Sequence, residues 1–178
     1  LALNNPALTC IKVDNVAYSN TNWSAGKDAT ATFSTTCPLS TPAAALDFDG
    51  VDDYVSIPDN NSLDITNTAT FEGWLFYDAA SSDDQSLFDK TEIGDAANYR
   101  CFINDGNSAL GFWNGSGSFE SGFTLTPGNL YHLAWVLSNN NVTIYVNGNN
   151  VASGSIAVGS VNNGPVTIGR DAIGRFLN

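Results

Sequence analysis

The sequence of 178 residues predicts an all-β fold, on three observations. Short runs rich in aromatic, Val and Ile residues recur along it, separated by turns of Asn, Asp and Gly. No long stretch has the period of an amphipathic helix. Asn147-Gly148 joins two of the runs, and both residues tolerate the positive φ angles of a type I′ hairpin turn. Short strands at roughly 8 to 12 residue spacing predict a two-sheet antiparallel sandwich, a signal that barrels and jelly rolls share.

The first residues differ from the rest of the chain. Residues 1–11 place Leu and Ile around Asn-Asn-Pro, a pattern that resembles the end of a leucine-rich repeat. Residues 12–37 resemble the Cys-bounded cap that closes such arrays in bacterial surface proteins, with Tyr18 and Trp23 covering the open edge of the core. The alternative is a disulfide-bonded lead-in to the sandwich. Residues 38–42, with two prolines and small polar residues, predict a semi-rigid linker.

The three cysteines are Cys10, Cys37 and Cys101. The chain has no CxxC pair and a single His, which argues against zinc and leaves a disulfide or free buried thiols. We expect Cys10 and Cys37 to form a disulfide, which implies an oxidising compartment and contributes roughly 3 to 4 kcal/mol. Cys101 lies in the strand pattern of residues 99–103, where a lone Cys is typically a small buried hydrophobe.

Strand patterns follow one another through the remainder of the chain. Trp74 and Trp135 alternate with their neighbours as core residues do, so both are expected in the core. His132, the only histidine, lies in a strand without a Ser, Cys or second His partner, so we expect it to be structural. The predicted strands cover residues 45–49, 54–57, 69–77, 85–90, 99–104, 110–113, 130–137, 142–146 and a strand from Val151 onward.

One hairpin also carries a family resemblance. Residues 131–154, YHLAWVLSNNNVTIYVNGNNVASG, resemble the signature hairpin of laminin G-like domains, members of the concanavalin A-like lectin/glucanase superfamily. Residues 45–55, 71–75 and 166–171 are similar to further strands of that family, in the same order. The resemblance implies a concanavalin A-like jelly roll.

This resemblance also implies a division of the chain. Residues 1–42 are expected to form the repeat end, cap and linker, and residues 43–178 the laminin G-like jelly roll. The family continues into a last strand that pairs beside the first, whereas the sequence stops at Asn178. Because a missing strand leaves backbone donors and acceptors unpaired, we expect the full-length protein to continue beyond Asn178.

Composition limits the partners. The chain has six Lys and Arg against eighteen Asp and Glu, a net charge of −12, which disfavours nucleic acid as a partner. No apolar run approaches the roughly 20 residues that cross a membrane. Fifteen of the acids are Asp, which suits turns and oxygen-rich metal sites better than helices.

Calcium is the expected cofactor, in a structural role. Asp49, Asp52 and Asp53 cluster around Gly50, and hard cations favour such carboxylates together with the carbonyls of a tight turn. The resemblance implies one calcium ion near loops of this kind, and Asp171 reaches it if the penultimate strand lies beside the first. The alternative is an Asp-Gly turn whose carboxylates are only hydrated.

Catalysis is not expected. The glucanases of the resembled superfamily carry Glu-x-Asp-x-(x)-Glu on one strand, whose carboxylates act as nucleophile and acid/base. Glu72, Glu92 and Glu120, the only glutamates of the chain, have no such spacing. The sequence therefore predicts a protein that is not an enzyme.

Four residues are candidates for glycan contact. Tyr99 and Trp113 lie in short strands that lead to polar turns, where a ring can stack on a sugar while Arg100 or Asn114 supplies hydrogen bonds. The alternative for Trp113 is that it joins the core with the other tryptophans.

Together these observations predict a non-catalytic extracellular recognition or adhesion module of a larger multidomain bacterial surface protein. The resemblance implies that rim loops bind a glycan or a surface protein, on a Gram-negative cell with type IX secretion as the export route. The alternatives are a structural spacer domain and an accessory carbohydrate-binding module of a polysaccharide-degrading enzyme. All three rest on analogy of fold.

Overall fold

The computed structural model describes residues 8–37, 45–92 and 96–178. They belong to two compact units, Leu1–Leu46 and Asp47–Asn178, where the sequence predicts a division between residues 42 and 43. The predicted linker at residues 38–42 and the first seven residues of the predicted repeat end lie outside the described residues. No helix of the described residues has the length and apolar character needed to cross a bilayer.

The N-terminal unit combines a small parallel sheet with a short helix. Strands β1 (Cys10–Lys12) and β2 (Thr32–Ser34) pair in parallel, and between them the chain forms α1 (Val16–Trp23) and the 3-10 helix η1 (Ser24–Gly26). Asn15 caps α1, because its side-chain oxygen accepts a hydrogen bond from Tyr18 N at 2.9 Å. Tyr18 and Trp23 pack edge to face and remain about half exposed, at 55% and 50%.

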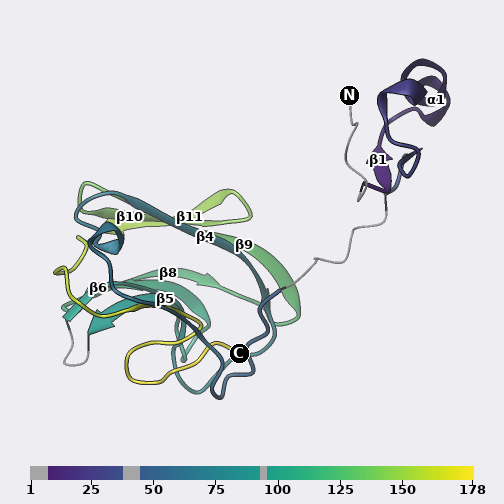
Figure 1. The fold of residues 1–178 in the computed structure, drawn as a ribbon. Helices are drawn as coiled ribbons and strands as arrows, with labels where there is room; N and C mark the ends of the chain where they lie inside the picture. Colours follow the sequence, from purple (N-terminus) through teal and green to yellow (C-terminus); the bar gives the residue numbers. More distant parts are fainter. Residues whose placement is uncertain (1–7, 38–44, 93–95) are drawn as a thin grey trace. The chain divides into compact units, whose positions relative to one another are not determined.

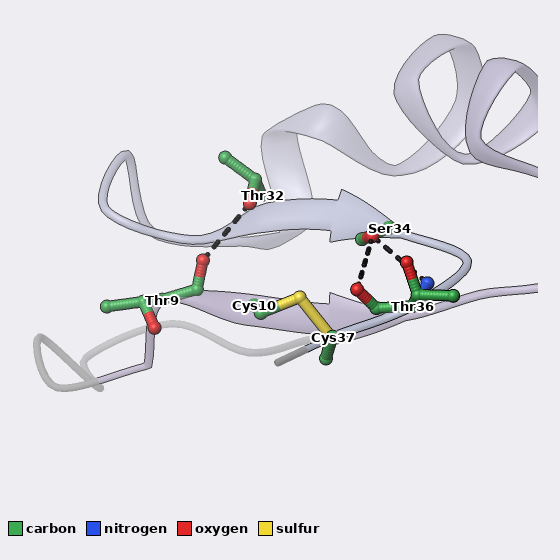
Figure 2. The surroundings of a disulfide bond; sticks show 6 residues. All are labelled: Thr9, Cys10, Thr32, Ser34, Thr36 and Cys37. Carbon is green, nitrogen blue, oxygen red and sulfur yellow. Dashed lines mark hydrogen bonds between the residues drawn. A yellow bond between two sulfur atoms is a disulfide. The ribbon is translucent and has the colours of Figure 1, made fainter. Parts of the chain in front are cut away.

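The predicted disulfide between Cys10 and Cys37 is confirmed. Figure 2 shows it beside the parallel ladder, where Thr9 O accepts hydrogen bonds from Thr32 N at 3.0 Å and from Thr32 Oγ1 at 3.2 Å. Strands of three residues bury little apolar surface. The covalent link between β1 and the segment after β2 therefore supplies constraint that packing alone does not.

The C-terminal unit is the predicted antiparallel sandwich, and Figure 1 shows its two layers, with β10, β11, β4 and β9 in one and β5, β6 and β8 in the other. The four-stranded sheet has the order β11-β10-β9-β4, and the six-stranded sheet the order β3-β12-β5-β6-β7-β8. The strands are β3 (Val55–Ile57), β4 (Ala69–Tyr77), β5 (Gln85–Glu92), β6 (Ala96–Ile103), β7 (Ala109–Trp113), β8 (Ser118–Thr124), β9 (Asn129–Ser138), β10 (Asn141–Val146), β11 (Asn149–Ser155) and β12 (Val166–Ile168), with the 3-10 helix η2 (Asn61–Leu63) after β3.

The core lies between the two sheets. Trp135 of β9 is fully buried there, as predicted, and its indole Nε1 donates a hydrogen bond to Gly111 O of β7 at 3.0 Å. This bond joins the two sheets and satisfies the one polar group of the ring. Cys101 is a free, buried thiol in the same core, as its strand pattern predicts.

The turns that organise the hairpins follow the sequence. Asn147 and Gly148 have φ angles of 50° and 78° between β10 and β11, which confirms the predicted type of turn. Asn139 and Asn140, between β9 and β10, have φ angles of 50° and 62°. Asn tolerates this left-handed conformation better than most residues, so Asn suits the tight turns that connect β9, β10 and β11.

Two strand predictions differ from the structure. Residues 45–49 alternate as a strand does, yet none of them belongs to a described strand or sheet. Strand β8 (Ser118–Thr124) was not predicted, because Ser and Gly alternate with its two Phe residues and weaken the β signal.

The prediction for Trp74 is wrong. Its side chain is 71% exposed, opposite His132 on the outer face of the four-stranded sheet. Phe71 and Leu75 face the core instead. Apolar side chains occupy both faces of β4. The prediction therefore took the face of Trp74 as the inner face, which is one residue out of register.

A buried cation fixes one end of the six-stranded sheet. Lys90 of β5 is fully buried, and its Nζ pairs with Asp59 Oδ1 at 2.5 Å and with Asp64 Oδ1 at 3.3 Å. The same ammonium donates to Asn162 O at 3.1 Å and Gly164 O at 2.8 Å. All of its donors are used, so Lys90 ties β5 to two loops that are distant in sequence.

Candidate functional site

The candidate site is a row of side chains across the outer face of the six-stranded sheet. Tyr99 and Cys101 of β6 face the core, so Arg100 between them points to the opposite face. In the ladder, Arg100 pairs with Asp89 of β5 on one side and with Trp113 of β7 on the other. These three residues are therefore neighbours, although they are separated along the chain.

A small open pocket lies over this row. Its lining includes Asp89 and Thr91 of β5, Arg100, Trp113, and Asp171 and Arg175 of the C-terminal segment; we call it the Trp113 pocket. Figure 1 shows the C-terminal segment, in yellow, on the side of β5 and β6 that faces away from the other sheet. The segment that follows β12 thus forms one wall, and the sheet forms the floor.

Four charged groups form a closed set of ion pairs beside the pocket. Arg100 Nη2 lies 2.6 Å from Asp84 Oδ2, and Arg100 Nη1 lies 3.2 Å from Asp171 Oδ2. Arg175 bridges the same two carboxylates, with Nε 2.6 Å from Asp171 Oδ2 and Nη1 3.1 Å from Asp84 Oδ2. We call Asp84, Arg100, Asp171 and Arg175 the Arg100 cluster.

Asp171 also holds the fold of the C-terminal segment. Its Oδ1 accepts hydrogen bonds from Ile173 N at 3.1 Å and from Arg175 N at 2.9 Å. Both oxygens of this carboxylate are thus occupied by protein donors. Burial raises the pKa of Asp171 and of Asp84 above the ordinary value, and the hydrogen bonds and the Arg175 charge oppose the rise.

Aromatic rings enclose the Arg100 guanidinium. Its carbon lies 4.7 Å from the centroid of the Phe102 ring and 5.1 Å from that of Trp113, both within the range of a cation–π interaction. Phe102 lies over Gly111, where a Cβ would collide with the ring, so glycine is required at this position. Arg100 is 6% exposed, and its Nε has no hydrogen-bond partner among the described residues.

Asp89 is the one carboxyl of the pocket without an ion pair to any described side chain. It is 1% exposed, and Thr91 Oγ1 donates a hydrogen bond to its Oδ2 at 3.0 Å. Burial raises the pKa of Asp89 to about 7, the Thr91 hydroxyl lowers it, and the nearby Asp171 carboxylate raises it further. A buried carboxyl that titrates near neutrality is typical of functional sites.

Two of the four predicted glycan contacts meet at this pocket, and two do not. Arg100 and Trp113 line it together. Tyr99 is buried in the core, 3% exposed and packed against Phe71, because it is one residue out of phase with Arg100. Asn114 shapes the turn after β7, where its Oδ1 accepts hydrogen bonds from Ser116 N and Gly117 N.

Sequence reasoning missed Asp84, Asp89 and Arg175. The available signal was the Asp89-Lys90 pair, two opposite charges in the middle of a predicted strand with apolar neighbours. Charged residues at buried strand positions need partners. The partners themselves come from distant segments, and only the fold brings them together.

Three of the four predicted calcium ligands lie together, and the fourth does not. One carboxylate oxygen from each of Asp49, Asp52 and Asp53 lies within 4.8 Å of the others, and all three residues are exposed. Two oxygens bound to one calcium ion lie at most about 4.8 Å apart, so this donor set fits the ion. Asp171 does not join the group, because it is held within the Arg100 cluster.

The outer face of the other sheet carries a second aromatic surface. Trp74 contacts the edge of His132 with ring centroids 5.2 Å apart, and His132 Nε2 lies 3.9 Å from Glu72 Oε2. This surface has no buried polar group of the kind that Arg100 and Asp89 provide to the Trp113 pocket.

Several solved structures share the fold. Domain 4 of an extracellular arabinanase from Geobacillus stearothermophilus, solved with arabinotriose, has a TM-score of 0.54 at 20% identity, over 70% of this chain and 62% of that chain. A candidate carbohydrate-binding protein from Bacteroides ovatus has a TM-score of 0.54 at 17% identity, over 73% of this chain and 39% of that chain. This chain thus spans less than two thirds of either.

In sequence, no curated protein matches the chain. The laminin G-like family profile, described as the concanavalin A-like lectin/glucanases superfamily, matches residues 49–178. This range contains both sheets of the sandwich and every residue of the Trp113 pocket. The chain therefore belongs to the concanavalin A-like lectin/glucanases superfamily.

Proposed function

We propose that the sandwich is a non-catalytic glycan-binding module and that the Trp113 pocket is its binding site. The observation that carries the proposal is the row of Asp89, Arg100 and Trp113, in which a partly exposed indole adjoins a buried carboxyl and a buried, unpaired Nε–H. Sugars present apolar C–H faces and polar hydroxyls together. A binding site for them combines an aromatic wall with a few fixed polar groups.

The Arg100 cluster supports this function by fixing the pocket in advance. Arg100 and Asp171 are held by several charge-assisted hydrogen bonds each, so their positions do not depend on a ligand. A preformed site loses less conformational entropy on binding. Two structures of this fold, the arabinanase domain solved in complex with arabinotriose and the candidate carbohydrate-binding protein, are compatible with a glycan-binding function.

The same geometry argues against hydrolysis at the pocket. Glycosidases use two carboxyl groups, one as acid and one as base or nucleophile. Of the two carboxyls in the lining, Asp171 is occupied by Arg100, Arg175 and two backbone N–H groups, so it has no free lone pair for such a role. Asp89 alone does not make the pair.

A glycan array with the purified sandwich and two single variants tests the proposal. Trp113→Ala is expected to weaken binding at least about tenfold, because the stacking wall is lost. Trp74→Ala is the matched control, since it removes an indole that is 71% exposed on the other sheet. Absence of any sugar binding by the wild-type protein, or loss with Trp74→Ala and not with Trp113→Ala, contradicts the proposal.

Calcium at Asp49, Asp52 and Asp53 belongs to the same proposal, in a stabilising role. Three exposed carboxylates around a tight turn repel one another, and a bound cation relieves this repulsion. We expect millimolar calcium to raise the melting temperature of the wild type and not that of Asp52→Ala/Asp53→Ala. An equal shift in both proteins identifies a non-specific effect of the ion.

The module is proposed to act outside the cell, as a recognition or adhesion part of a multidomain surface protein. The Cys10–Cys37 disulfide supports an oxidising compartment. The N-terminal unit is proposed as the capped end of a leucine-rich-repeat region, with type IX secretion as the route. The accessory module of a polysaccharide-degrading enzyme is the second candidate, and a structural spacer is the outcome if no glycan binds.

A further inference from the structure

We infer that the Trp113 pocket selects uncharged sugars over uronic acids and other anionic sugars, with Asp89 accepting a hydrogen bond from one ligand hydroxyl and Arg100 Nε donating one to another. The inference rests on the proposed glycan-binding function and names the ligand class for that site.

The first argument is that both arginines of the pocket are already paired with carboxylates of the protein. Pockets that bind carboxylate or phosphate groups present guanidinium groups that can receive them. Arg100 and Arg175 are both already paired with Asp84 and Asp171. An anionic ligand would have to displace a carboxylate of the protein from these pairs, which is costly because that carboxylate would stay largely buried without its positive partner.

The second argument is the sum of charges. The Arg100 cluster contains two carboxyl groups and two positive charges, so Asp89, when ionised, adds one excess negative charge to the cluster and the pocket together. The wider surface has the same sign. Residues 1–46 contain two Lys and two Asp and no other charged residue, so the net charge of −12 falls entirely on the sandwich.

The third argument is the hydrogen-bonding capacity that the protein leaves unused. Arg100 Nε is a buried donor without a partner in the described structure, and such a group lowers stability unless something pairs with it. Asp89 accepts hydrogen bonds from the Thr91 hydroxyl and the Thr91 backbone N–H, and it makes no ion pair with a described side chain, so part of its acceptor capacity remains unused. One donor and one acceptor on adjacent strands match two hydroxyls of a single sugar residue, which each can accept or donate.

Trp113 completes the arrangement as the next residue in the row. The Arg100 guanidinium carbon lies 5.1 Å from the centroid of its ring, so indole and guanidinium lie side by side in the pocket lining. In the proposed arrangement, a sugar stacks by its C–H face on Trp113 and directs hydroxyls toward Arg100 and Asp89, the next two residues of the row. An uncharged sugar satisfies all three groups without bringing a negative charge.

The pH behaviour supplies an independent readout. Asp89 faces Thr91 on its own strand, Arg100 on β6, and Asp171 and Arg175 on the C-terminal segment, with Asp84 across the ion pairs. Burial raises the pKa of Asp89 to about 7, so the carboxylate form predominates at pH 8 and the protonated form at pH 5. Carboxylates are stronger hydrogen-bond acceptors than carboxylic acids, so sugar affinity is expected to rise with pH.

The test is calorimetric titration of the wild type and Asp89→Asn with matched pairs of methyl glycosides, galactoside with galacturonide and glucoside with glucuronide, at pH 5 and pH 8. At pH 8 the wild type is expected to bind the neutral member of the preferred pair at least about tenfold more tightly. Its affinity for that sugar is expected to fall roughly tenfold at pH 5, and that of Asp89→Asn to stay unchanged.

The outcomes separate this inference from the function on which it rests. Equal binding of neutral sugar and uronide by the wild type, or an equal pH dependence in Asp89→Asn, overturns the charge selection and leaves glycan binding intact. No binding of any glycoside or array glycan overturns both. If Asp89→Asn does not fold, the comparison of neutral sugar with uronide and the pH series of the wild type still decide the matter.

Discussion

Lys90 and Arg100 are two buried cations on neighbouring strands of one sheet, and they have opposite chemical circumstances. Lys90 has every donor occupied, by Asp59, Asp64 and two backbone carbonyls. Arg100 has an unpaired Nε, lies beside a carboxyl without an ion pair, and lines a pocket with an indole in its wall. The difference teaches that burial of charge alone does not mark a site. Unused hydrogen-bonding capacity next to a pocket does.

The largest expected effect is on the Lys90 side of the comparison. Lys90→Ala leaves Asp59 and Asp64 without their cation and two carbonyls without their donor. We expect the free energy of unfolding to fall by about 3 to 5 kcal/mol. Urea denaturation measures it, and sugar affinity of the remaining folded protein is expected to stay the same. A loss below 1 kcal/mol contradicts the structural role given to Lys90.

The next effect is a gain of stability at Asp89, with a defined pH dependence. Its pKa rises from 3.8 in the unfolded chain to about 7 in the folded one, so the folded state binds the proton more tightly. The free energy of unfolding therefore falls as pH rises from about 4 to about 7, and Asp89→Asn removes this loss. At pH 8 the variant is expected to be more stable than the wild type by about 2 to 4 kcal/mol.

The same variant provides its own control at lower pH. At pH 4 both proteins carry an uncharged side chain at position 89, so the difference between them is expected to shrink to less than about 1 kcal/mol. Guanidinium denaturation of both proteins at pH 4, 6 and 8 measures the trend. If the difference in free energy of unfolding between the two proteins is the same at all three pH values, the raised pKa of Asp89 is contradicted.

The smallest expected effect on stability is at Arg100. Arg100→Lys keeps a positive charge between Asp84 and Asp171 and removes the Nε donor and the flat surface against Trp113. Stability is expected to fall by about 1 to 2 kcal/mol, because the lysine ammonium cannot make all the hydrogen bonds of the buried guanidinium, whereas sugar affinity falls about tenfold. Arg170→Lys is the matched control, because Arg170 stacks on Tyr54 and does not line the pocket.

The sequence was sufficient for most strands of the sandwich and insufficient for the site. Strand β4 was predicted with its observed bounds, and the hairpin at Asn147-Gly148 was predicted correctly, because both depend on neighbouring residues. The inner face of β4 was not, since Trp74 and Phe76 make its outer face as apolar as its inner one. Alternation cannot identify the inner face of a strand when both faces are apolar.

The site depends on contacts between distant residues, which explains what was missed. Arg100 and Trp113 were predicted as ligand contacts from their residue types, and Tyr99 was included because sequence alone does not fix the phase of a short strand. Asp84 and Arg175 are 91 residues apart and meet only in the fold. No local pattern predicts such a pair.

The most direct test of the Trp113 pocket is an NMR titration that follows the indole Nε1–H signals of the four tryptophans and the Nε–H signal of Arg100. On addition of a neutral oligosaccharide that the array identifies, Trp113 and Arg100 Nε are expected to shift together, and Trp23 and Trp74 to stay in place. A shift at Trp74 with Trp113 and Arg100 unchanged contradicts the account.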